Sequence, residues 1–232
     1  MARVYTFHAL PLSATRAAFG SRDARLRALL GARLDAEARD PSRASEPAYY
    51  EAAARVADAL IFEGALPPSS SPLENAAARA LIRMLLTAGP KMELGPEGDR
   101  FTYALTQIAL TGGVVDDAPL ATTDLERAVL RALADGRSLF GEAMDRHDAH
   151  GWLAAGDEVR ALATIVASPA WATYVGAGRF RASAVAAFES EREAYGRWLA
   201  DVARDGKDLF FCQEALEGAA PCPIMPLKKR KR

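Results

Sequence analysis

The chain has 232 residues, of which half are hydrophobic and a quarter are charged. This composition is typical of a folded globular protein and excludes a disordered or fibrous one. The formal net charge is −1, and the five C-terminal residues carry +5, so residues 1–227 sum to −6. An acidic body disfavours general binding to nucleic acid, because phosphate repels it at long range.

Two further features bear on membranes and on the cellular compartment. The first ten residues lack the long apolar stretch and the small-residue cleavage pattern of a secretory signal, and no apolar run approaches the roughly 20 residues that cross a bilayer. Cys212 and Cys222 are the only cysteines, which favours a reducing compartment with inert thiols. We therefore expect a cytoplasmic protein without a membrane span.

Strand-like segments occur near both ends of the chain. Residues 4–10 are rich in β-branched and aromatic side chains and end at Pro11, and residues 208–212 form a second such run just after Gly206. An isolated strand leaves a row of backbone donors and acceptors unsatisfied. We therefore expect these two segments to pair and to bring the chain ends together.

Between the two strands, apolar residues recur at helical spacing and the boundaries carry helix signals. Ser21 is predicted to cap the first helix, and capping boxes are predicted at Ser71 with Glu74 and at Thr123 with Glu126. Helices are expected over about residues 22–34, 47–63, 72–88, 101–111, 124–135, 157–166 and 179–204.

These elements predict a mainly α (α+β) fold. It consists of a multi-helix domain with one small sheet, formed by short strands near the N- and C-termini. Residues 1–214 are expected to form a single domain, and residues 215–232 a flexible, proline-containing basic tail, because prolines resist both helix and strand.

Three segments carry a resemblance to a known family, together with the opening strand. They are Phe19 to Leu26, the Gly-Trp-Leu of residues 151–153 leading into Asp157 to Leu162, and Trp198 to Phe211. In them the chain is similar to a family of uncharacterised bacterial proteins grouped as a domain of unknown function. The resemblance covers most of residues 3–213 and implies a bacterial origin, but it brings no reaction and no catalytic residues.

Residues 145–150, Asp-Arg-His-Asp-Ala-His, hold two of the three histidines of the chain. On a helix, His147 and His150 would share a face, and Asp145 or Asp148 would orient a ring or supply an oxygen ligand to a divalent metal. A zinc site needs three or four protein ligands, and His8 is the only other histidine, so the set is incomplete. The alternative interpretation is a solvated, polar helix end just before Gly151.

The dipeptide of His147 and Asp148 also resembles the paired residues of a family of metal-dependent phosphohydrolases named after it. That family's pattern needs a further upstream histidine on a helix and a distant aspartate. The upstream candidate here, His8, lies in a predicted strand, which counts against the match.

No serine-nucleophile, dinucleotide-binding or P-loop motif occurs in the sequence, so no catalytic residue is predicted. We expect a non-enzymatic bacterial protein, regulatory or immunity-type, that binds a protein partner and needs no cofactor. The oligomeric state stays open.

Two alternatives to this role remain at this point. One is a metal-dependent hydrolase centred on residues 145–150, with a divalent metal at His147, Asp148 and His150. The other is association with nucleic acid through the basic cluster at the C-terminus. The competing interpretation of this cluster is a tail that only keeps the protein soluble and has no dedicated target. The residues of this cluster are Lys228, Lys229, Arg230, Lys231 and Arg232.

Overall fold

The computed structural model of the chain describes residues 3–39, 47–66, 70–87, 93–115, 118–139, 142–143 and 150–215. These residues fall into two compact units. The first unit takes its residues from Met1–Leu10, Glu93–Arg137 and Asp145–Arg232, and the second from Pro11–Met92 and Ser138–Met144. No helix in these described ranges combines the length and the apolar character that crossing a membrane requires.

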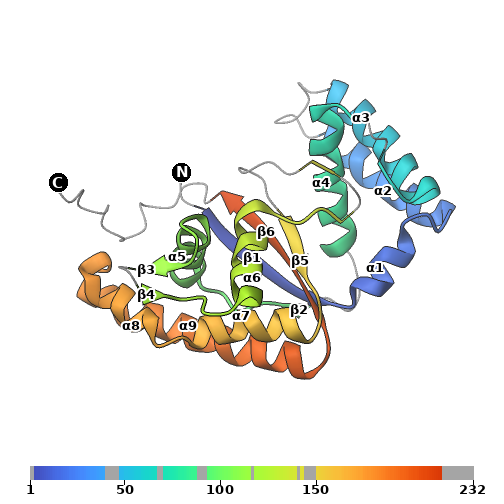
Figure 1. The fold of residues 1–232 in the computed structure, drawn as a ribbon. Coiled ribbons are helices and arrows are strands. Elements are labelled where there is room, and N and C mark those ends of the chain that lie inside the picture. Colours follow the sequence, from blue (N-terminus) through green and yellow to red (C-terminus); the bar gives the residue numbers. More distant parts are fainter. Residues whose placement is uncertain are drawn as a thin grey trace. The chain divides into compact units, whose positions relative to one another are not determined.

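The first unit contains the sheet and the helices that cover it (Figure 1). Its elements are β1 (Arg3–Leu10), β2 (Glu93–Leu94), α5 (Asp99–Leu110), β3 (Val114–Val115), β4 (Ala118–Pro119), α6 (Asp124–Asp135), β5 (His150–Leu153), α7 (Asp157–Ala167), α8 (Ala170–Tyr174), the π-helix η2 (Val175–Arg179), α9 (Ala182–Arg204) and β6 (Asp208–Ala215).

The sheet has the strand order β2-β1-β6-β5 and is antiparallel throughout. Strands β1 and β6 pair along their whole length, from Arg3 opposite Ala215 to Leu10 opposite Asp208. The predicted pairing of the two terminal segments is therefore confirmed. The predicted mainly α fold, with a small sheet formed by strands near the N- and C-termini, is confirmed as well. Strands β2 and β5 extend the sheet on either side.

One face of the sheet forms the core of this unit. Tyr5, Phe7 and Phe211 point to this face and are almost fully buried. Helices α7 and α9 run side by side and contribute to the same core (Figure 1). Trp171 and Phe188 extend it, with their ring centroids 5.7 Å apart.

Strand β5 corrects one prediction from the sequence. Gly151 lies inside the strand, opposite Phe211, so the prediction of a helix end before it is wrong. A Cβ atom at Gly151 would lie 2.5 Å from Cζ of Phe211 and 2.8 Å from the backbone nitrogen of Arg137. The glycine is therefore required by the close approach of a neighbouring ring, and not by a turn.

The second unit is a group of helices. Its elements are α1 (Leu12–Ala18), α2 (Ala24–Ala38), α3 (Pro47–Asp58), the π-helix η1 (Ala59–Glu63) and α4 (Pro72–Thr87). Residues 142–143 are attached to α4: Ala143 donates its backbone N–H to Oδ1 of Asn75 at 2.8 Å, and its carbonyl accepts from Nη1 of Arg79 at 2.6 Å.

Of the three helix caps predicted from the sequence, the structure confirms two and corrects one. Both capping boxes are confirmed, since Glu126 accepts from the Thr123 N–H at 3.0 Å and donates its own N–H to the Thr123 hydroxyl at 3.2 Å, and Ser71 and Glu74 do the same. The cap at α2 is Asp23 instead of Ser21: its Oδ1 accepts from the Arg25 N–H at 2.8 Å, whereas the Ser21 hydroxyl donates to the carbonyl of Ala18.

Candidate functional site

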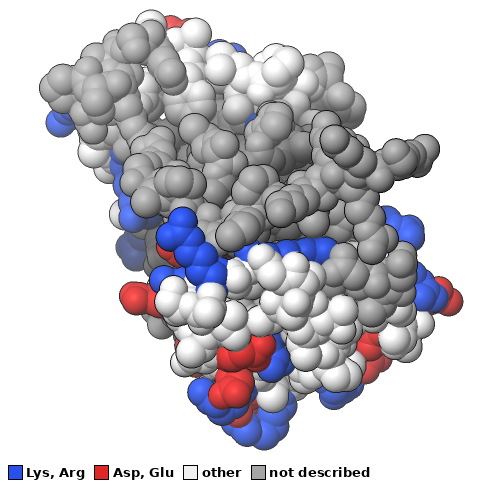
Figure 2. Space-filling view, turned by 90° about the vertical axis from the view of Figure 1, so that its left-hand side faces the viewer, with Lys and Arg blue, Asp and Glu red and all other residues white. Residues whose placement is uncertain are grey.

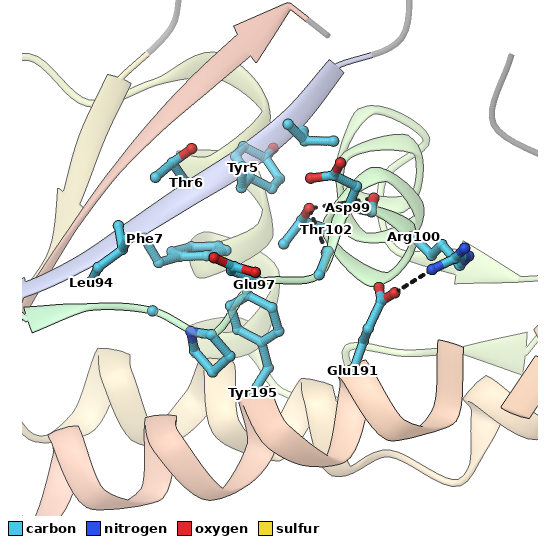
Figure 3. A pocket seen from close by; sticks show the side chains of 14 residues that line it. Tyr5, Thr6, Phe7, Leu94, Glu97, Asp99, Arg100, Thr102, Glu191 and Tyr195 are labelled. Atoms are coloured by element: carbon cyan, nitrogen blue, oxygen red, sulfur yellow. Dashed lines mark hydrogen bonds and ion pairs between the residues drawn. The ribbon is translucent and has the colours of Figure 1, made fainter. Parts of the chain in front are cut away.

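A groove of about 510 Å³ lies at the outer edge of β1 within the first unit (Figure 3). Its walls come from residues 4–7 of β1, from the segment that leads from β2 into the first turn of α5, and from Glu191 and Tyr195 of α9. The side chains of Phe7 and Tyr195 meet edge to face, with ring centroids 6.0 Å apart. The groove thus combines an apolar floor with a strand edge.

The outer edge of β1 is only partly paired in the described part of the chain. Strand β2 pairs with His8 and Ala9, and the Gly95 N–H donates to the carbonyl of Phe7 at 2.8 Å. Beyond Gly95, no described residue forms a backbone hydrogen bond with this edge. In an antiparallel strand the backbone groups of alternate residues point to the same side. Because the Phe7 carbonyl points to this edge, the N–H and C=O of Tyr5 do so as well.

The segment from β2 to α5, Gly-Pro-Glu-Gly, fits closely between its neighbours. A Cβ atom at Gly95 would lie 3.2 Å from both the carbonyl oxygen of Phe7 and the ring of Trp198. A Cβ atom at Gly98 would lie 3.0 to 3.1 Å from the side chain of Glu191. The two glycines therefore hold Glu97 and Asp99 at the groove.

Glu191 anchors the N-terminus of α5 to α9. Its Oε1 pairs with Nη1 of Arg100 at 2.9 Å, and its Oε2 accepts from the Phe101 N–H at 2.9 Å (Figure 3). The side chain of Glu191 is 14% exposed. Glu193 on the same helix, by contrast, is 61% exposed.

The groove is acidic. It presents three carboxylates, those of Glu97, Asp99 and Glu191, against the single guanidinium of Arg100, so its formal charge is −2. Arg100 is engaged by Glu191, and among the described residues no basic side chain forms an ion pair with Glu97 or Asp99. Burial and the nearby carboxylates of Glu191 and Asp99 raise the pKa of the Tyr195 phenol, which therefore stays neutral.

Leu94 adds an exposed apolar side chain to the rim of this groove. It lies on β2, lines the groove and is 58% exposed. A large apolar side chain in contact with water can cover an apolar side chain of a ligand. The groove therefore offers three kinds of interaction: backbone hydrogen bonds from the strand edge, negative charge and apolar contact.

We expect substitution of Glu191 by glutamine to lower the free energy of unfolding by about 1–2 kcal/mol. The change keeps the shape of the side chain but removes the charge that Arg100 and the N-terminus of α5 bind. Glu193→Gln on the same helix is the matched control, and its exposed pair with Arg197 at 3.7 Å predicts a change below about 0.5 kcal/mol. Urea denaturation measures both, and equal effects would contradict the anchoring role.

The predicted metal site is only partly within the described residues. His147 and Asp148 lie outside them, whereas His150 is the first residue of β5 and fully buried. Since His150 belongs to a strand, the expectation that it shares a helix face with His147 is wrong. In the described ranges no group of three metal-ligating side chains occurs, and a divalent metal at His147, Asp148 and His150 stays a prediction.

His8 lies on the same face of the sheet as His150. Both imidazoles are next to the ring of Phe210, with centroid distances of 6.1 Å for His8 and 5.7 Å for His150. Burial lowers the pKa of the His8 imidazole, so it is neutral at pH 7. The ring of Phe210 packs against the His8 imidazole, whose buried Nδ1 has no hydrogen-bond partner among the described residues.

The predicted nucleic-acid site at the C-terminus lies entirely outside the described residues, so the structure does not test it. On the face drawn in Figure 2, acidic and basic side chains of the described residues are interspersed. These residues therefore present no large surface of one sign on that face.

The groove could not be predicted from the sequence, because its residues are far apart in the chain. Glu191 follows Asp99 by about 90 positions, and only the packing of α5 on α9 brings them together. A local signal was nevertheless present in Gly-Pro-Glu-Gly-Asp at residues 95–99, where two glycines and a proline precede a helix with an acidic first turn. That signal predicts a tight connection and not a binding groove.

Comparisons of the chain with protein-family models, with curated proteins and with solved structures found no match.

Proposed function

We propose that the protein is an interaction protein that binds an extended, basic segment of a protein partner in the groove at the edge of β1. In the regulatory or immunity-type role predicted from the sequence, this groove would be the surface that contacts the partner. The observation that carries the proposal is the backbone of Tyr5, which no described residue pairs on this edge, beside three carboxylates.

Strand addition is a common way for a sheet edge to bind a peptide. The main-chain hydrogen bonds supply affinity, and pockets for alternate side chains supply specificity. Here the bound segment would lie antiparallel to β1, beyond the last described backbone hydrogen bond to this edge, from Gly95 to Phe7. Its backbone would pair with Tyr5, and Leu94 would cover one of its apolar side chains.

The charge of the groove selects the partner segment. Carboxylates at Glu97 and Asp99 attract lysine and arginine side chains and repel acidic ones, which adds specificity and speeds association. Because the exposed carboxylates are screened by salt, we expect binding to weaken as the ionic strength rises.

The test titrates the full chain with a blocked, fluorescent peptide of sequence Val-Lys-Val-Arg-Val-Lys. We expect saturable binding that an acidic counterpart, Val-Glu-Val-Asp-Val-Glu, does not show. Asp99→Lys should weaken binding at least tenfold, whereas the matched control Glu193→Lys, on α9 outside the groove, should change it less than twofold. Absence of saturable binding, or equal effects of the two substitutions, would overturn the proposal.

Backbone methylation separates strand addition from simple charge attraction. Only alternate residues of an added strand turn their N–H groups to β1. Two peptides, N-methylated at the valines or at the basic residues, should therefore differ. One should keep its affinity and the other should lose about fivefold, which corresponds to the loss of one hydrogen bond of about 1 kcal/mol, from the peptide N–H to the Tyr5 carbonyl. Equal affinities of the two peptides would contradict strand addition.

A further inference from the structure

The end of the described chain lies close to the open end of the groove. Ala215, the last residue of β6, is opposite Arg3, the first residue of β1. Strand β2 covers the other end of β1, at His8 and Ala9. The chain thus leaves the sheet at the end where the outer edge of β1 is unpaired in the described residues.

The segment that follows is long enough to reach that edge. Residues 216–226 span up to about 36 Å when extended, since each residue adds at most about 3.3 Å. The outer edge of β1 is two strand spacings from β6, or about 10 Å. A connection of this length can therefore return along the edge in either direction.

The sequence of the last residues fits the chemistry of the groove. Pro226 is the last proline, so residues 227–232, Leu-Lys-Lys-Arg-Lys-Arg, have a backbone N–H at every position. Their five positive charges complement the three carboxylates of the groove, and Leu227 supplies an apolar side chain. Residues 227–232 can therefore form antiparallel backbone hydrogen bonds with Tyr5.

We infer that residues 227–232 dock in the groove of their own chain and compete with the partner segment. The inference rests on the proposed function, because it assigns an intramolecular competitor to the same site. The basic end of the chain then acts as a built-in regulator of binding.

The connection sets the strength of the competition. A short linker that can span the distance gives an effective concentration of about 1 mM. If the tail binds with a dissociation constant of about 0.1 mM, it occupies the groove in about ten of eleven molecules. A partner segment in trans then binds about tenfold more weakly than it does to an empty groove.

The experiment compares the full chain with a variant in which all five basic tail residues are serine (K228S, K229S, R230S, K231S and R232S). A second variant exchanges lysine and arginine at these positions and keeps the charge. We expect the serine variant to bind the Val-Lys-Val-Arg-Val-Lys peptide about tenfold more tightly, and the exchange variant to bind like the original chain.

Loss of charge repulsion would also tighten binding, so a second readout without peptide is needed. Hydrogen exchange of the Tyr5 amide should be about tenfold slower in the full chain than in the serine variant, at every protein concentration. Equal exchange rates would overturn the inference, and protection that disappears on dilution would do so as well, because it would indicate docking between copies.

The outcomes for the two proposals remain distinguishable. If both chains bind the peptide equally and their Tyr5 amides exchange equally, the inference fails and the proposed function stands. If neither chain binds the peptide, the proposed function fails and the inference fails with it.

Discussion

Substitution of Gly151 by alanine is expected to lower the free energy of unfolding by about 3 kcal/mol. The added methyl group would lie 2.5 Å from Cζ of Phe211 and 2.8 Å from the backbone nitrogen of Arg137, so either the ring or the strand must move. Overpacking of a closely packed core typically costs about 1–3 kcal/mol, and here one of the two contacts is rigid backbone. Urea denaturation measures the loss.

Gly196→Ala is the matched control for this substitution. Gly196 lies inside α9, and its Cβ atom would be 3.7 Å from Cγ1 of Val166, an ordinary contact. Alanine favours the helix over glycine by about 1 kcal/mol, so this variant should be more stable than the original chain. A Gly151→Ala protein of unchanged stability would contradict the packing of β5 against β6.

Truncation of Trp171 to alanine is expected to cost about 3–5 kcal/mol of stability. Its indole is fully buried and contacts the rings of Phe101 and Phe188, with centroid distances of 5.4 and 5.7 Å. Its Nε1–H donates to the carbonyl of Ile165 at 2.8 Å. The aromatic cluster joins α5, α8 and α9, so the loss of this ring leaves a cavity among three helices.

Trp171→Phe separates the packing from the hydrogen bond. Phenylalanine fills most of the space but cannot donate to Ile165, so we expect a smaller loss, about 1–2 kcal/mol. Denaturation curves of the two variants should therefore differ clearly in midpoint. Equal losses would mean that the hydrogen bond, and not the aromatic packing, makes the larger contribution.

The predictable parts of this fold are those in which a short stretch of sequence determines the conformation. Thr123 and Glu126 cap α6 because both partners lie within one turn, and the two terminal strands are recognised by their side chains alone. Gly151 was misread because its conformation depends on Phe211, 60 positions further along the chain. Strand β2, with two residues, is too short for any periodicity to indicate it.

The candidate site was less predictable than the fold, for the same physical reason. The carboxylate of Glu191 belongs to a charged helix that looks solvated in sequence, and only its position against the N-terminus of α5 makes it a structural anchor. The edge of β1 is likewise a property of the sheet order and not of residues 3–10 themselves. The cluster at residues 145–150 was predicted as a metal site because its residues are adjacent in the sequence.

The most direct test of the account measures amide hydrogen exchange at Tyr5 in the tail-serine variant, with and without a saturating amount of the Val-Lys-Val-Arg-Val-Lys peptide. Strand addition predicts that the Tyr5 amide slows about tenfold with the peptide at about ten times its dissociation constant, while the Ala9 amide, at a position that β2 already pairs, does not change. An unchanged exchange rate at Tyr5 in the peptide-saturated protein would contradict the account.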